Sequence, residues 1–366
     1  MSATAADTSE LPKDSTSPPR SFVPTRGQLF GLLGLAVISL LPSLWGDFGF
    51  FVGQFAAVYA MIGLSVVIVT GYGGLISVMQ YSFAGVGAIT TGVAMASWGW
   101  PFWLAVPLAA VATVPVAALV GMISVRLKGL YLAIATLTFA NALGETLFRW
   151  ERVTGGQSGW QVERPTLGPI DFSSDVAFYI LCLTVVLLLV WMTEGLRTSR
   201  IGRAMLAVKD NELEAQALGI NVYKTKLAAF IISGMVAGIG GAFLASLITI
   251  LTPTAFQSPY SEATSIVLLS LVVIGGINRS IGAFFGAISL VVTTQVFAGA
   301  DCFYSFVGIY SACLLIFFLL YRPGGMVEVG QRMGALFKYK PILAVAIIFV
   351  IIATNVGGAF FFVNAC

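Results

Sequence analysis

The chain has 366 residues, of which 58% are hydrophobic and only 10% are charged, and its mean hydropathy is +0.95. A soluble domain carries about 25% charged residues, so this composition excludes that class and indicates a membrane protein. Histidine is absent, which removes most zinc, haem and Ser-His or Cys-His chemistry. We therefore expect no catalytic residues and no metal site. The formal net charge of +3 gives no reason to expect a nucleic-acid partner.

Residues 1–26 are rich in Ser, Thr and Pro and are predicted to form a disordered cytoplasmic tail, because they cannot bury a core. They do not resemble a cleaved signal peptide, since the first apolar stretch after them has the length of a membrane span.

Residues 27–326 are predicted to form one transmembrane domain, and residues 327–366 an extra C-terminal segment with one additional span. A window of about 20 apolar residues crosses a bilayer. Such windows lie near residues 29–45, 50–70, 74–97, 102–125, 130–148, 175–193, 227–250, 263–277, 281–299, 303–321 and 342–362. The predicted fold class is an all-α polytopic membrane protein with about 10–11 transmembrane helices.

The placement of Lys and Arg predicts the orientation of these spans. With the N-terminus in the cytoplasm and eleven segments threaded, all but three of the 19 basic residues fall on the cytoplasmic side. The three on the outside are Arg149, Arg152 and Arg164. The C-terminus is then expected outside.

Glycine occurs 40 times, often at the small-residue spacing that lets helices approach closely in lipid. A broken or short helix is favoured at Gly71–Gly74 and at Gly275–Gly276. The segments that start there, GGLISVMQYSFAGVGA and GGINRSIGAFFGAISL, are weakly alike. Transporters built from two related halves often carry broken helices at matching places.

Polar side chains inside spans are costly and usually face a cavity or another helix. The candidate solute-path residues are Gln80, Tyr81 and Ser82 on the third span and Thr136, Thr138 and Asn141 on the fifth, followed by Thr293, Thr294 and Gln295. The alternative for each is an ordinary interhelical hydrogen bond. Glu145 is expected to pair with Arg149, four residues further along its helix.

The largest predicted outer loop, residues 149–174, has three open interpretations: a cap over the path, a surface for an external partner, or a plain connector. The four cysteines lack metal-ligand spacing. Cys302 and Cys366 both fall outside in this topology, and whether they pair is left open.

A charged segment, Thr198–Lys226, interrupts the apolar sequence after the sixth span. Thr198 or Ser199 is predicted to cap a short helix that ends near Val208, with Ile201, Met205 and Val208 on one face. Asn211 and Glu214 have the spacing of a capping box, and Gly219 is a natural helix stop. Two short helices of mixed charge favour a protein partner over an anionic lipid surface.

The sequence RIGRAMLAVKDNELEAQALGINVYKTKLAAFIISGMVAGIGGAFLA resembles the coupling segment of LivM-type permeases, which belong to bacterial ABC importers of branched-chain amino acids. The resemblance continues in GYGGLISVMQYSFAGVGAITTG, LKGLYLAIATLTFA, TGGQSG, SIVLLSLVVIGGINRSIGAFFGA and YRPGGM. It covers roughly residues 50–326 in order. This chain departs from the pattern at Met79–Gln80, where relatives carry Gly–His, and at Asn141, where they often carry Glu.

The resemblance implies a type II ABC importer permease fold in the bacterial cytoplasmic membrane, with cytoplasmic coupling helices between the sixth and seventh spans. The implied partners are two cytoplasmic ATPase subunits, a homologous permease subunit, an extracytoplasmic substrate-binding protein, a small polar solute and the lipid bilayer. The coupling segment is residues 197–222, with Arg200, Gly202, Arg203, Asp210, Glu212, Glu214, Ala217, Leu218 and Gly219 as its candidate ATPase-contacting residues. No Gly-Lys-Ser/Thr phosphate loop occurs. The chain is therefore expected to be no enzyme and to bind no cofactor, with ATP and Mg²⁺ held by the ATPases.

Two other functions remain open. One is an ABC permease for urea, short amides or simple sugars. The other is an ion-coupled carrier or channel, which would need carboxylates near the membrane midplane. Glu145 is the acidic side chain nearest to such a role, and it lies toward the outer end of its span.

Overall fold

The structure is a computed structural model that describes residues 46–127, 129–167, 170–256, 260–298 and residue 316. The predicted tail 1–26, the spans at 29–45, 303–321 and 342–362, the C-terminal segment 327–366, and Cys302 and Cys366 lie outside the described residues. Nearly all regular structure in the described part is helical, and each of its strands has two residues. This confirms the predicted all-α class.

The long helices are α2 (Gly46–Val66), α3 (Gln80–Gly92), α4 (Phe102–Ser124), α5 (Leu130–Glu145), α7 (Asp175–Thr198), α8 (Arg200–Asp210), α10 (Val222–Ile248), α11 (Tyr260–Gly275) and α12 (Ser280–Ala298). Shorter pieces are η2 (Val67–Tyr72), η3 (Val93–Ser97), η4 (Leu147–Arg149), α6 (Glu151–Thr154), η5 (Gly156–Ser158), α9 (Glu212–Ala217) and η6 (Pro253–Phe256). The strands are β1 (Trp160–Gln161), β2 (Thr166–Leu167), β3 (Ile170–Asp171) and β4 (Ile250–Leu251).

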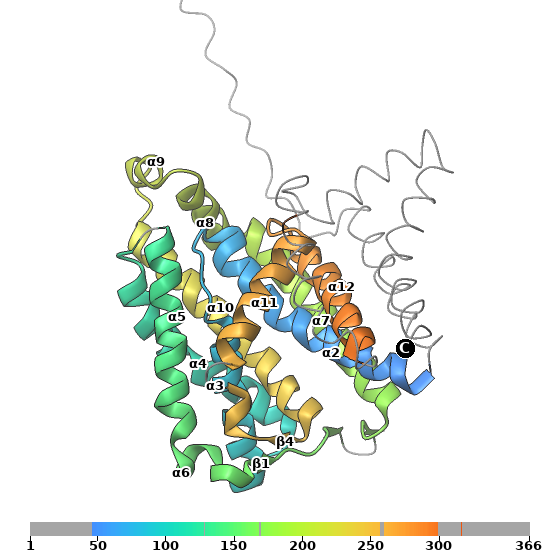
Figure 1. Cartoon of the computed structure of the whole chain (residues 1–366). Coiled ribbons are helices and arrows are strands. Elements are labelled where there is room, and N and C mark those ends of the chain that lie inside the picture. Colours follow the sequence, from blue (N-terminus) through green and yellow to red (C-terminus); the bar gives the residue numbers. More distant parts are fainter. Residues whose placement is uncertain (1–45, 128, 168–169, 257–259, 299–315, 317–366) are drawn as a thin grey trace, which may run out of the picture. The chain divides into compact units, whose positions relative to one another are not determined.

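The helix formed by α2 and η2 lies at the centre of the described part, as Figure 1 shows. An 18-residue apolar window within its span, Phe48–Tyr72, is 89% buried, and α7, α10, α11 and α12 all pack against this helix. A helix that is apolar on every side and covered on every side is a core helix. The helix α4 packs on α10 and α3 instead, and α5 packs on α11, α4 and α3.

Small residues set how closely α3 and α10 approach. Gly87 lies so close to Gly238 that an added Cβ would overlap the Gly238 carbonyl, and Gly241 lies equally close to the carbonyl of Ala84. Close backbone approach replaces the hydrophobic driving force that lipid cannot provide between helices. The glycine spacing noted in the sequence therefore serves helix packing at this crossing.

A helix break separates η2 from α3. Residues 73–79 are not helical, Gly74 has a φ of +67°, and α3 starts only at Gln80. The predicted break at Gly71–Gly74 is confirmed, whereas the predicted continuous span 74–97 is shorter than expected. The π-helical turn η2 ends at Tyr72, and the non-helical linker 73–79 joins it to α3. The chain therefore forms two separate helical pieces in this region.

The helices α11 and α12 form a hairpin with a bend of 114° between Thr264–Gly275 and Ser280–Ser289. Gly275 packs against Gly282, and Gly286 packs against the carbonyl of Leu271, so the two helices fold back along each other from the turn. The predicted break at Gly275–Gly276 is confirmed. The two spans predicted at 263–277 and 281–299 are better described as this bent pair, and five other helices in the described part are long and apolar enough to span a membrane.

The described residues of the segment 149–174 form short helices and two-residue strands. Strand β1 pairs with β4, the indole Nε1–H of Trp160 donates to the carbonyl of Val153 at 2.9 Å, and β1 packs on α3. Glu145 and Arg149 form the predicted ion pair at 2.9 Å. The backbone of this loop is paired to the segment after α10 through β1 and β4, so the loop is ordered locally, and its three interpretations stay open.

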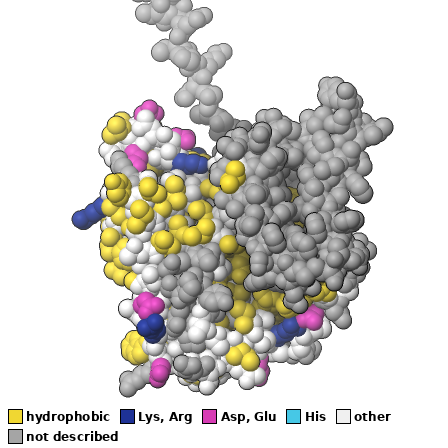
Figure 2. Space-filling view, in the orientation of Figure 1, with side chains coloured by type: hydrophobic (Ala, Val, Ile, Leu, Met, Phe, Trp, Pro, Cys, Tyr) yellow, Lys and Arg dark blue, Asp and Glu magenta, His cyan; other side chains and the backbone are white. Residues whose placement is uncertain are grey.

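Hydrophobic side chains cover the outside of α4 and α5, between charged groups near both ends, as Figure 2 shows. Members of this surface are more than 40% exposed: Leu104, Val111, Leu119, Met122, Ile123, Leu130, Tyr131 and Ile134. So large an apolar area on the outside of long helices is expected of a surface that faces lipid or another membrane subunit.

We predict that Gly275→Ala destabilises the folded chain, because its Cβ would overlap the Gly282 carbonyl inside the hairpin. Overpacking of this kind costs about 1–3 kcal/mol. The apparent thermal midpoint of the purified protein in detergent should fall. The matched control is Gly63→Ala on α2, whose Cβ would have side-chain methyl groups as its nearest neighbours, those of Leu271, Val272 and Ala283 at 3.2, 3.3 and 3.5 Å. Equal midpoints for the two variants would contradict the tight hairpin.

Candidate functional site

The charged segment begins with a capped helix. The Oγ of Ser199 accepts a hydrogen bond from the backbone N–H of Gly202 at 3.1 Å, and α8 runs from Arg200 to Asp210. Ser199 is thus the N-cap predicted from the sequence. Met205 and Val208 are buried as predicted, but Ile201 is 49% exposed, so the apolar face is narrower than expected.

The kink between α8 and α9 depends on Asn211. Its Oδ1 accepts from the backbone N–H groups of Leu213 and Glu214, and its Nδ2 donates to the Glu214 carboxylate at 2.7 Å. In the usual capping box the Glu accepts from the backbone N–H of the cap residue. Here that N–H donates to the carbonyl of Ala207 and closes α8. One asparagine therefore ends one helix and starts the next.

Gly219 ends α9 in the left-handed region with a φ of +79°. The N–H of Gly219 donates to the carbonyl of Gln216, and the N–H of Ile220 donates to the carbonyl of Ala215. This pair of bonds is the Schellman arrangement, and it confirms the predicted helix stop.

A buried ion pair fixes α9 to the start of α10. The ammonium of Lys226, which is only 4% exposed, lies 2.6 Å from a carboxylate oxygen of Glu212. Breaking a buried pair by removing one partner leaves an uncompensated charge, which is strongly destabilising. The segment is thereby held as a folded insert.

The ammonium of Lys209 contacts residues that are far from the charged segment in the sequence. It donates to the carbonyl of Gly71 at 2.6 Å and to the Oδ1 of Asn278 at 2.9 Å. Gly71 lies in the last turn of η2, and Asn278 lies in the turn of the α11–α12 hairpin. Partial burial lowers the pKa of Lys209; Asp210 opposes this shift and Arg197 adds to it. The end of α8 is therefore bonded to both helix breaks.

The two helix breaks also contact each other, and we call this region the break junction: Gly71, Tyr72, Ile277, Asn278 and Ser280. The hydroxyls of Tyr72 and Ser280 are 2.8 Å apart, and an added Cβ on Gly71 would overlap the carbonyl of Ile277. The N–H of Ser280 donates to Glu194 on α7 at 3.4 Å. Three helix ends and one turn thus share a polar contact region.

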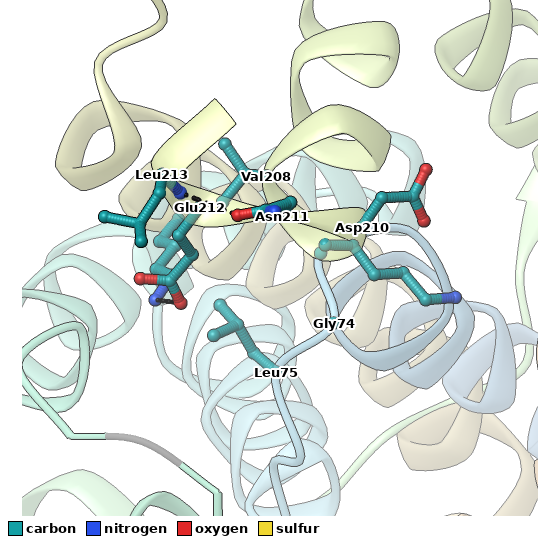
Figure 3. Close-up of a pocket in the computed structure, with 10 residues that line it drawn as sticks. Gly74, Leu75, Val208, Asp210, Asn211, Glu212 and Leu213 are labelled. Carbon is teal, nitrogen blue, oxygen red and sulfur yellow. Dashed lines mark hydrogen bonds and ion pairs between the residues drawn. The ribbon is translucent and has the colours of Figure 1, made fainter. Parts of the chain in front are cut away.

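A cavity of about 400 Å³ separates the linker after η2 from the charged segment, and Figure 3 shows both walls. One wall carries Gly74 and Leu75, and the other runs from Val208 to Leu213. Lys226 also lines it. The linker and the charged segment therefore enclose an open space, although they are in close contact where Gly74 meets Lys209.

The candidate ATPase-contacting residues divide into two groups. Arg200, Arg203, Asp210, Glu214, Ala217, Leu218 and Gly219 are exposed. Gly202 instead packs against the carbonyl of Leu196, and Glu212 holds Lys226, so these two support the fold of the insert. Leu213, which the sequence interpretation did not select, is 77% exposed, and Leu218, the C-cap residue of α9, is 79% exposed. Its position in the sequence, one helical turn before the candidate Ala217, could have identified Leu213 as a further candidate contact residue.

Gln80 and Thr136, two of the candidate path residues, are bonded around the break between η2 and α3. The Oγ1 of Thr136 accepts from the backbone N–H of Val78 at 3.1 Å, and the Oε1 of Gln80 accepts from the hydroxyl of Ser65 at 3.0 Å. The structure therefore brings α5, the linker and α2 together at this point.

The other candidate path residues are more dispersed. Tyr81 stacks on Phe256 with ring centroids 5.3 Å apart, and Thr138 is exposed and bonded within its own helix. Buried side-chain oxygens of Ser82, Asn141 and Ser265 have no hydrogen-bond partner in the described part of the chain. Ser265 was not foreseen. Thr293, Thr294 and Gln295 lie on α12, in the part whose side chains are not described.

Known proteins similar to this chain are transport subunits. The family described as "Branched-chain amino acid transport system / permease component" matches residues 50–321. The high-affinity branched-chain amino acid transport system permease proteins LivM of Salmonella typhimurium and of Escherichia coli are each 28% identical over 293 residues, which cover 74% of this chain and 67% of each relative. The L-arabinose transport system permease protein AraH of Escherichia coli is 34% identical over 104 residues, 28% of this chain and 30% of that protein.

No solved structure matches the chain. The family match covers well over half of the 366 residues and includes the break junction, the charged segment and every candidate path residue. The chain belongs to the permease family of branched-chain amino acid transport systems.

Proposed function

We propose that this chain is the permease subunit of an ATP-driven ABC importer that carries branched-chain amino acids across the bacterial cytoplasmic membrane. Two cytoplasmic ATPase subunits drive it through residues 197–222. A homologous permease subunit completes the path, and an extracytoplasmic binding protein delivers the solute. ATP and Mg²⁺ belong to the ATPases.

The observation that carries this proposal is a pair of exposed leucines on a rigid insert. Leu213 and Leu218 are 77% and 79% exposed on a short helix that is capped at both ends and fixed by the Lys226–Glu212 pair. Apolar side chains that project from a folded, charged surface suit a groove in a soluble protein. Glu214 and Asp210 beside them would set the register of that contact.

The solute assignment is supported by the family and by the character of the candidate path. Phe148 and Phe256 lie against Gly85, and Tyr81 packs against Phe256. Ser82, which follows Tyr81 in the sequence, has a buried hydroxyl with no hydrogen-bond partner in the described part of the chain. An aliphatic amino acid presents few polar groups beyond its ammonium and carboxylate. A sugar carries a hydroxyl on nearly every carbon, and each hydroxyl would need a hydrogen-bond partner. This apolar surrounding offers few such partners.

A simple-sugar permease is the second candidate, and the partial similarity to AraH favours keeping it. Urea and short amides form a third solute class. An ion-coupled carrier is less well supported, because Glu145 is exposed and paired with Arg149.

We expect proteoliposomes that contain this chain, its ATPases and its second permease to accumulate L-leucine when ATP is inside and the binding protein outside. L-arabinose and urea, tested with the same binding protein, serve as the controls. Accumulation of L-arabinose in place of L-leucine would support the sugar candidate. Uptake by this chain alone without nucleotide would contradict the ABC mechanism.

We expect Leu218→Asp to weaken assembly with the ATPases by at least about tenfold, the scale of one lost interface anchor. The measurement is the ATPase affinity of the permease pair in detergent. The matched control is Leu130→Asp, which changes a leucine that is 73% exposed at the start of α5. If both substitutions had the same small effect, α9 would not be the contact surface.

We expect Gly219→Val and Glu214→Arg to reduce the solute carried per ATP while the protein stays folded. Valine does not tolerate the left-handed φ of Gly219, so the end of α9 should unwind. Arginine at position 214 loses the bond to Asn211. Coupled uptake and ATP hydrolysis would be measured together. Unchanged ratios in both variants would argue against the coupling assignment.

A further inference from the structure

The side chain of Lys209 has contacts that the proposed docking leucines lack. Its residue is partly exposed, but its amine donates to Gly71 and Asn278 at 2.6 and 2.9 Å, whereas Leu213 and Leu218 are 77% and 79% exposed. It lies at the end of α8, one residue before the charged Asp210 and two before the kink at Asn211. Lys209 is therefore part of the insert in the sequence, but its ammonium contacts the membrane part of the chain.

The first of its two contacts leads toward the candidate path. Gly71 ends the central helix, and Gly74 lies against the Lys209 side chain, where an added Cβ would be 2.8 Å from its Cγ. The same linker then bonds to Thr136 through the N–H of Val78 and enters α3 at Gln80. The linker is therefore held by Lys209 at one end and by Thr136 and Gln80 at the other.

The second contact leads to the hairpin. Asn278 lies in the turn between α11 and α12, and the neighbouring Ser280 bonds to Tyr72 and to Glu194. Since the two helix breaks also touch each other through Gly71 and Ile277, a displacement of Lys209 acts on both of them. Helices with broken or bent segments are the parts of transporters that commonly line the path.

We propose that Lys209 is the positioning residue that joins the charged segment to both helix breaks, so that movement of the insert moves the linker 73–79 and the α11–α12 hairpin together. This inference rests on the proposed function of the segment. Hydrogen-bond networks and rigid helices are the usual carriers of coupling between distant parts of a protein. The cavity between the linker and the segment leaves the linker room to shift.

The test compares Lys209→Met, Lys209→Arg and the control Lys224→Met in the complete complex reconstituted in proteoliposomes. Lys224 is an exposed lysine of the same segment, and in the described structure its ammonium makes no hydrogen bond. L-leucine uptake and ATP hydrolysis are measured in the same vesicles. We expect Lys209→Met to lower the solute carried per ATP by at least about tenfold, the factor for one lost hydrogen bond to a charged group, because the substitution removes two such bonds. Lys209→Arg should restore most of the ratio, and Lys224→Met should leave it unchanged.

The outcomes separate this inference from the proposed function. If the wild-type complex does not couple ATP to uptake, the proposed function fails first. If it couples and Lys209→Met transports like Lys224→Met, the role of Lys209 is overturned. If Lys209→Met does not assemble, Asn278→Ala provides the decision, because it removes one acceptor and leaves the lysine in place. A lowered ratio in Asn278→Ala supports the inference, and an unchanged ratio overturns it.

Discussion

The ammonium group of Lys209 joins parts of the chain that are 138 and 69 residues away from it. One lysine thereby makes the end of α8 part of the membrane domain. The partners explain why a charged side chain is suited to the position. A carbonyl in the last turn of η2 lies at the negative end of a helix dipole, and a cation there is stabilising. The amide oxygen of Asn278 provides the second acceptor.

Helix breaks are tolerated at membrane depth only where the freed backbone groups find partners within the protein. This constraint explains the density of contacts at the break junction. Glu194 accepts the first N–H of α12, Thr136 accepts the N–H of Val78, and Lys209 binds the carbonyl of Gly71. Each break is thus stabilised by a side chain from another helix. If either break moves, these hydrogen bonds must be exchanged, or the residues that form them must move as well.

Local features of the charged segment could be predicted from the sequence because they depend on neighbouring residues. Ser199, Asn211 and Gly219 act within one or two turns, and the structure has them at the predicted helix ends. Both helix breaks were also indicated by their glycines. The fold-back of α11 on α12 was not predictable, because hydropathy reports the length of an apolar segment and not its direction. The contacts of Lys209 join distant segments, so no local pattern indicates them.

The solvent exposure of its side chains separates the residues of the insert into two groups. Residues that sequence reasoning grouped together by charge are separated by the structure: Glu212 faces inward to Lys226, whereas Glu214 remains at the surface with Leu213 and Leu218. The proposed coupling role requires both kinds of residue. In that proposal one set binds the ATPase, and the other holds the insert to the membrane part. The caps and the buried ion pair restrict the conformation of this segment of fewer than thirty residues, and such restriction suits an element that is proposed to move as one body.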